Sequence, residues 1–164
     1  MSARSKSRKR ALDVLYASDV RSVSPEVVLA ELVAERSAAR DAINPYTVEL
    51  VEGVSAHLDR IDELLLTHAE GWAPDRMPVV DRTLLRMGIF EILWGHEVPD
   101  AVAVSEAVAL ATEMSTDDSP RYINGLLGRI LQLKPMLPEG RIQSNEPAAA
   151  SALESPSGES GALD

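Results

Sequence analysis

Hydrophobic residues recur at spacings of three and four along most of this chain, which is the pattern of amphipathic helices. The first stripe begins at Ala11 and predicts a helix that continues from the preceding basic residues to about Val20. Ser24-Pro25 has the form of an N-cap followed by proline at the first helical position. It predicts a second helix that ends near Ala39.

The most regular stripe follows Asn44-Pro45, which repeats the same start signal. It predicts one long core-facing helix, whose apolar positions are Val51, Val54, Leu58, Ile61 and Leu65. Prolines in segments 71–74 and 77–78 then interrupt the chain, because proline lacks the backbone donor and disfavours helical geometry in the residue before it. Any helix between these two breaks is therefore a single turn.

Apolar residues from Val79 to Trp94 cover most of the helical circumference, which predicts the central helix of the core. Gly95 is expected to cap this helix, and Pro99 prevents its continuation. The next apolar stripe, within residues 104–111, predicts a helix packed against the central one.

The last helix is predicted to start at Ser119-Pro120 and to end at Pro135. Asn124-Gly125 is typical of a hairpin turn, but its flanks lack strand alternation and keep the three-and-four spacing. We therefore expect the helix to continue through this pair. No segment indicates a strand, so the chain is predicted to be an all-α bundle.

The chain has 164 residues, 45% of them hydrophobic, which suits one compact domain. Residues 138–164 carry little apolar bulk, so a disordered acidic tail is predicted there. There is no run of about 18 apolar residues and no secretory leader. We therefore expect a cytoplasmic protein without a membrane span.

Chemistry-bearing motifs are sparse. The chain has no cysteine, which excludes disulfides, Cys-based zinc sites, iron–sulfur clusters and thiol nucleophiles. His57, His68 and His96 match no metal-binding spacing, and Asp117-Asp118 is more typical of helix capping than of a catalytic dyad. We therefore expect no enzymatic activity and no cofactor.

The formal net charge is −10, which taken alone argues against a nucleic-acid binder. The charge is segregated, however, because residues 1–10 hold basic residues and no acidic one. These basic residues are Arg4, Lys6, Arg8, Lys9 and Arg10. Such an arm either binds phosphates or serves only as a solvated, solubilising tail. The acidic remainder of the chain suits a basic partner.

Tyr16 lies at the edge of the first apolar stripe, on the same side of the helical wheel as Lys9. Nucleobases stack on exposed aromatic rings with a gain of about 1–3 kcal/mol each, while phosphates lie on neighbouring cations. The alternative is that Tyr16 is a half-buried core residue. The sequence leaves both interpretations of this ring open.

Five groups of segments occur in an order and spacing that are specific in combination. They are Arg8-Lys9-Arg10-Ala11 with Leu15-Tyr16; Trp72 with Asp75-Arg76; Val80-Asp81-Arg82-Thr83-Leu84-Leu85-Arg86 with Glu91-Ile92-Leu93; Val98-Pro99 with Ser105-Glu106-Ala107-Val108; and Asp118-Ser119 with Tyr122-Ile123-Asn124-Gly125-Leu126-Leu127. Together they resemble the NusB family of bacterial transcription antitermination factors, over roughly residues 4–133.

The resemblance implies about seven helices in two packed three-helix subunits. It divides the chain into a basic RNA-binding arm (1–10), a NusB-like helical domain (11–137) and the disordered tail (138–164). It further implies binding to the boxA element of ribosomal-operon leader RNA together with the ribosomal protein NusE, within an RNA polymerase antitermination complex. No catalysis is part of that role, and a homodimer is one form the free protein can take.

The resemblance also implies two sets of site residues. The RNA-binding set, in which Arg8 is the best-placed arm cation, is Arg4, Lys6, Arg8, Lys9, Arg10, Tyr16, Asp118 and Arg121. The set that contacts NusE is Asp75, Arg76, Asp81 and Arg82. Thr112 and Met114 depart from the family pattern, which places a phosphate contact and a stacking contact there in doubt.

Two other functions compete with this hypothesis. The chain is alternatively an RNA-binding module related to the N-terminal domains of ribosomal-RNA cytosine methyltransferases, which would require a catalytic domain downstream. It is otherwise a helical scaffold or dimerisation protein in which the arm only aids solubility, and that function predicts no RNA binding.

Overall fold

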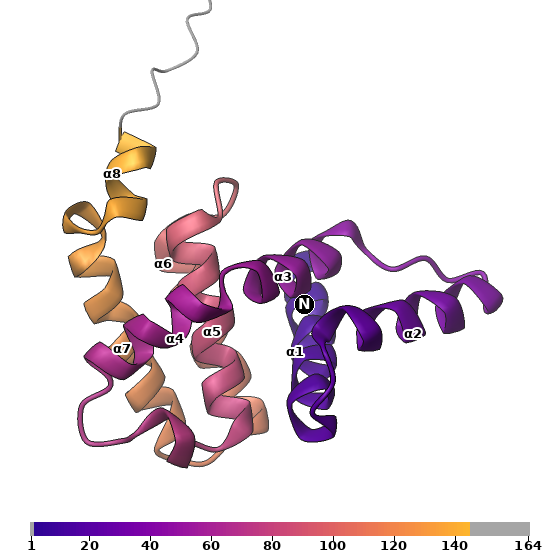
Figure 1. The fold of residues 1–164 in the computed structure, drawn as a ribbon, viewed down its shortest axis with the longest axis horizontal. Coiled ribbons are helices and arrows are strands. Elements are labelled where there is room, and N and C mark those ends of the chain that lie inside the picture. The colour runs from indigo at the N-terminus through magenta and orange to yellow at the C-terminus, as the bar shows by residue number, and fades with distance from the viewer. Residues whose placement is uncertain (1, 145–164) are drawn as a thin grey trace, which may run out of the picture.

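The computed structural model describes residues 2–144, which fold into helices and connections without a strand among them (Figure 1). Two single turns of 3-10 helix, η1 (Pro74–Arg76) and η2 (Lys134–Met136), separate some of the longer helices. The α-helices of this part of the chain are α1 (Ala3–Arg21), α2 (Pro25–Ala38), α3 (Pro45–Ala56), α4 (Leu58–His68), α5 (Val79–Trp94), α6 (Asp100–Met114), α7 (Ser119–Leu133) and α8 (Pro138–Ser144). The predicted all-α class is confirmed.

The helices form two three-helix units that share one core. Helices α1, α2 and α3 pack on one another at the right of Figure 1, and α5, α6 and α7 form the second unit at its left. Helix α4 packs on α5 and α7, while α1 and α3 of the first unit pack against α5. The two packed subunits that the family resemblance implies are therefore present.

Helix α5 is the centre of the core, as its apolar circumference predicts. It contacts helices of both units, and its largest apolar side chains are almost completely buried. These side chains include Leu84, Leu85, Ile89, Ile92 and Leu93. Among residues 2–144, no helix combines the length and the apolar character needed to cross a bilayer.

The long helix predicted after Asn44-Pro45 is wrong in one respect, because the chain bends at His57 and forms two helices. His57 has φ −109° and ψ 14°, and its ring stacks on that of Trp94 with centroids 4.1 Å apart. The bend lets α3 pack on α1 and α2 while α4 packs on α5 and α7. A straight helix could not pack on α1 and α2 at one end and on α5 and α7 at the other.

Two other local predictions are confirmed. The segment between the proline breaks is the single turn η1, and Asn124-Gly125 lies inside α7. Residues 3–10 are the first turns of α1, so the helix predicted to continue from the basic residues is present.

The start of the predicted tail needs correction. Residues 138–144 form α8, where Glu139 accepts a hydrogen bond of 2.6 Å from Arg60. The rest of the predicted tail lies outside the described residues.

The contact between α3 and α5 depends on the missing side chain of Gly53. A Cβ atom added there would lie 2.1 Å from Cζ of Phe90, whereas one added to Gly128 in α7 would meet nothing within 4 Å. We expect Gly53→Ala to lower the free energy of unfolding by about 1–3 kcal/mol through overpacking. Gly128→Ala should raise it by about 0.5–1 kcal/mol, because alanine restricts the unfolded chain. Urea unfolding monitored by circular dichroism measures both, and equal stability of the two variants would contradict the proposed close packing.

Candidate nucleic-acid interface

Arg8, predicted as the best-placed RNA-binding cation, is buried between the two helical units. Its side chain is only 4% exposed, and its Nε donates to Oε1 of Glu91 at 2.8 Å. Oε2 of Glu106 lies 3.9 Å from Nη1, and the ring of Tyr46 lies under the guanidinium with its centroid at 5.5 Å. The hydroxyl of Tyr46 donates to the same Glu91 oxygen at 2.7 Å. Arg8 therefore joins α1 to α3, α5 and α6, and its predicted RNA contact is corrected to a structural role.

The electrostatics of this cluster keep Arg8 charged. Burial acts to lower the pKa of Arg8, but the hydrogen bond and the negative charge of Glu91 outweigh it, so the pKa is raised. Burial, together with the charge of Glu91, also raises the pKa of Tyr46, which therefore remains a neutral hydrogen-bond donor. Nη2 of Arg8 is buried without a hydrogen-bond partner among the described residues.

The other four arm cations divide into a paired and an unpaired set. Arg4 forms an ion pair of 3.0 Å with Glu97, and Lys9 forms one with Glu113. Within residues 2–144, Lys6 and Arg10 form no ion pair, and they line the same cavity. These two side chains supply the uncompensated positive charge of α1.

The ring of Tyr16 is accessible, with a residue exposure of 42%. It lies on α1 outside the buried stripe of side chains that includes Leu12 and Leu15. Tyr16 is therefore about half-buried, and the exposed part of its ring is available for stacking.

Asp118 and Arg121 lie at a second location, beside a cavity of about 400 Å³ against the end of α4. Both are exposed. Asp118 precedes α7 but makes no side-chain capping bond there. Instead the neighbouring Ser119 is buried, and its hydroxyl donates to Asp81 at 2.7 Å. The carboxylate of Asp118 is therefore free to contact a ligand.

Sequence reasoning missed other residues of this second cavity, namely His68, Glu70, Tyr122 and Arg129. The four-residue spacing of Arg121, Gly125 and Arg129 marks one face of α7 and is the signal that identifies the lining. Tyr122 meets the ring of Trp72 edge to face at 5.2 Å. This cavity and the one beside Lys6 and Arg10 share no lining residue, so the arm and Asp118 line separate cavities.

The residues predicted to contact a protein partner also divide. Asp75 and Arg76 are exposed on η1. Asp81 is completely buried, and it accepts hydrogen bonds from Ser115 and Ser119. Arg82 is largely buried, and its guanidinium bonds to Asp19 and to the carbonyl of Pro74 at 3.2 Å. Asp81 and Arg82 are therefore corrected to structural roles, since internal partners hold both.

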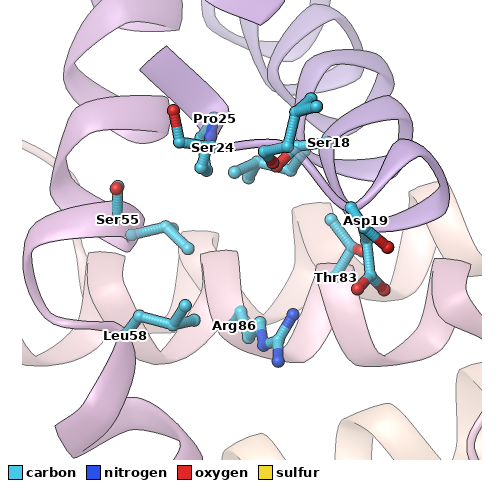
Figure 2. Close-up of a pocket in the computed structure, with 12 residues that line it drawn as sticks. Ser18, Asp19, Ser24, Pro25, Ser55, Leu58, Thr83 and Arg86 are labelled. Atoms are coloured by element: carbon cyan, nitrogen blue, oxygen red, sulfur yellow. The ribbon is translucent and has the colours of Figure 1, made fainter. Parts of the chain in front are cut away.

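A third cavity, of about 340 Å³, lies where the two units meet. Figure 2 shows Asp19 of α1 and Thr83 and Arg86 of α5 on one side of it, with Ser55 and Leu58 on the other. Arg86 donates to both oxygens of Asp62, at 2.8 and 2.9 Å. Among residues 2–144, no three His, Asp or Glu side chains are grouped to hold a metal ion.

Comparison with known proteins identifies the family. The sequence model of the NusB family matches residues 5–132, from the first turn of α1 to the last turn of α7. This chain belongs to the NusB family. A transcription antitermination protein NusB from Beutenbergia cavernae is 56% identical over 144 residues, which cover 84% of this chain and 94% of the relative. Another, from a Nocardioides species, is 56% identical over 137 residues, covering 84% and 99%.

Solved NusB structures have the same fold. NusB from T. maritima is 26% identical and superposes with a TM-score of 0.70, covering 80% of this chain and 92% of that one. A structure of the antitermination factors NusB and NusE in complex with double-stranded RNA contains a chain that is also 26% identical. It superposes with a TM-score of 0.68 over 79% of this chain and 96% of that one.

In this NusB-family chain Arg8 is buried and the adjacent Lys9 is exposed, so the same substitution should change stability much more at Arg8 than at Lys9. Arg8→Gln should lower the free energy of unfolding by about 3–5 kcal/mol, because it leaves the buried carboxylate of Glu91 without its cation. Lys9→Gln removes one partner of an exposed pair and should leave the unfolding midpoint nearly unchanged.

Urea unfolding at pH 7 measures both changes. Arg8→Lys, which keeps the charge, should give an intermediate loss. A similar small loss for Arg8→Gln and Lys9→Gln would show that the cluster around Arg8 does not stabilise the fold.

Proposed function

We propose that this chain is a non-catalytic, cytoplasmic antitermination factor that binds boxA leader RNA of ribosomal RNA operons together with NusE. The bound complex acts on elongating RNA polymerase. The family match over residues 5–132 carries the proposal, because it includes α1, η1 and the start of α7, where the exposed site residues lie. The solved relative with NusE and double-stranded RNA supports both partners.

The RNA surface that the geometry favours consists of Lys6, Arg10 and Tyr16 on α1, with Asp118 and Arg121 at the second cavity. Lys6 and Arg10 need not break an ion pair to bind phosphate, whereas Arg4 and Lys9 must. The exposed ring of Tyr16 provides a sequence-tolerant stacking surface for a base.

The partner surface that we assign to NusE consists of Asp75 and Arg76 on η1 and the cavity of Figure 2. Arg82 links these features, since it bonds both to Pro74 in η1 and to Asp19 at the cavity. The net charge of −10 suits a basic ribosomal protein. Two linked partners raise each other's effective concentration, so RNA and NusE should bind cooperatively.

A mobility-shift titration with boxA RNA and a scrambled RNA, each with and without NusE, tests the function. We expect boxA to bind more tightly than the scrambled RNA and NusE to increase the difference. The double variant Lys6→Gln/Arg10→Gln should reduce the slope of log K against log salt by about 0.7 for each phosphate that the variant no longer neutralises.

Arg4→Gln/Lys9→Gln is the matched control for that double variant, because it removes the same charge from α1 but from residues that are already paired. It should reduce the slope by less than half as much. The proposed function fails if the wild-type protein binds neither RNA nor NusE, alone or mixed, at modest ionic strength.

Asp118 lies on the proposed RNA surface, where its carboxylate can accept hydrogen bonds from bases but its negative charge repels the phosphates. Asp118→Asn is expected to raise RNA affinity roughly two- to fivefold, a screened interaction of under about 1 kcal/mol, without changing the melting temperature. Ser119→Ala should instead lower the free energy of unfolding by about 1–3 kcal/mol, because its hydroxyl is bonded to buried Asp81. A melting-temperature loss in Asp118→Asn with unchanged affinity would assign Asp118 to helix capping.

A further inference from the structure

A cationic cavity of about 200 Å³ lies between the first turns of α1 and the connection from α2 to α3. The cationic residues that line it are Lys6, Arg10 and Arg36, and its one acidic residue is Asp41. This local excess of positive charge contrasts with the net charge of −10 of the whole chain. Such a concave, positively charged site favours an anionic ligand.

The cations of this cavity differ in their partners. Lys6 and Arg10 form no ion pair with any described residue. On α1, Arg10 interacts electrostatically with Asp13: burial raises the pKa of Asp13, and the charge of Arg10 acts to lower it. Arg36 is held by Asp41 through a hydrogen-bonded ion pair. An incoming anion would therefore meet two free cations and one that is occupied by an internal carboxylate.

Backbone geometry at the end of α2 explains why Asp41 occupies Arg36. Arg40 adopts a left-handed conformation with φ 54°, and the amide of Asp41 donates to the carbonyl of Arg36 at 2.9 Å. The amide of Arg40 donates to the carbonyl of Ser37 at 3.1 Å. These two bonds form a Schellman motif, which folds the chain back so that the Asp41 side chain reaches Arg36. The pair is local and requires no contact with another helix.

Helix α3 adds to the positive potential of the cavity. Asn44 and Thr47, at the start of α3, line the cavity, so the positive end of the helix dipole faces it. The side chain of Asn44 already accepts the amide of Tyr46 at 2.9 Å. The helix therefore contributes potential rather than free donors, and the cationic side chains must supply the contacts.

We propose that this cavity is a subsite for a backbone phosphate of bound RNA, held by Lys6, Arg10 and Arg36. Asp41 occupies Arg36 in the free protein, and the phosphate displaces it. The inference rests on the proposed RNA-binding function and extends the RNA surface from α1 onto the connection between α2 and α3. Because a phosphate contact reads no base, the subsite contributes to affinity and not to sequence preference.

Because Arg36 and Asp41 carry opposite charges, neutralising each should change RNA affinity in opposite directions. Arg36→Gln should weaken binding of boxA and scrambled RNA alike, by about three- to tenfold, and reduce the salt slope by about 0.7. Asp41→Asn should strengthen binding of both RNAs by a similar factor, because it releases Arg36 and removes a negative charge from the cavity. A merely structural ion pair would instead give losses of stability for both variants and no opposite changes in affinity.

Arg21 and Glu31 provide the matched controls, since they form a similarly exposed ion pair between α1 and α2 that lies outside the cavity. Arg21→Gln and Glu31→Gln change the net charge by the same amounts and should alter RNA affinity by less than about twofold. Melting temperatures of all four variants, measured in parallel, should stay close to that of the wild type.

The outcomes separate the two levels of the proposal. If the wild-type protein does not bind RNA, the proposed function fails and the subsite fails with it. If the wild type binds RNA but Arg36→Gln and Asp41→Asn match their controls, or shift affinity in the same direction, only the phosphate subsite is overturned.

Discussion

The buried ion pair between Arg8 and Glu91 is the interaction on which the functional surface depends. Charges are removed from water at a large energetic cost, so such a pair persists only when its geometry is good and further hydrogen bonds satisfy it. Here Tyr46 donates to Glu91 and its ring lies under the guanidinium, while Glu106 lies nearby. The pair fixes the rotation of α1 relative to α5, and with it the direction of every other cation on the helix.

Because Arg8 is fixed against α5, helical periodicity decides in which direction each of the other arm cations points. Residues two positions before and after Arg8 lie about 160° away from it around the helix, on either side. Lys6 and Arg10 are therefore directed to the face opposite Arg8, where they are neighbours at i and i+4 and line one cavity. Arg4 and Lys9 reach Glu97 and Glu113, which lie just before α6 and near its end. One helix thus presents a structural, a paired and a free set of cations.

The sequence predicted the helices well because periodic burial is a local property of each segment. It failed at His57, where the bend serves tertiary contacts: α3 and α4 pack on different helices, and the His57 ring stacks on Trp94, which is distant in sequence. It also assigned Arg8 to the arm by charge alone, although Arg8 lies in phase with Ala11 and Leu12 and this phase marks it as inward-facing. Asp81 was misassigned for a different reason, because its hydrogen-bond donors are Ser115, directly after α6, and Ser119, at the start of α7, both far along the chain.

The ion pairs of the arm also change what the arm can contribute to RNA affinity. If all its cations were free, each would add a salt-dependent, sequence-independent contact, and the chain would bind any polyanion. With Arg8 buried, and with Arg4 and Lys9 paired, only Lys6 and Arg10 contribute without breaking an internal bond. Two such contacts are too few for tight binding on their own. Tight binding must therefore draw on contacts that depend on the ligand, such as stacking on Tyr16, or on a second protein held at the same RNA. Under the proposed function, the acidic side chains that pair with Arg4, Arg8 and Lys9 would therefore favour selective over non-specific RNA binding.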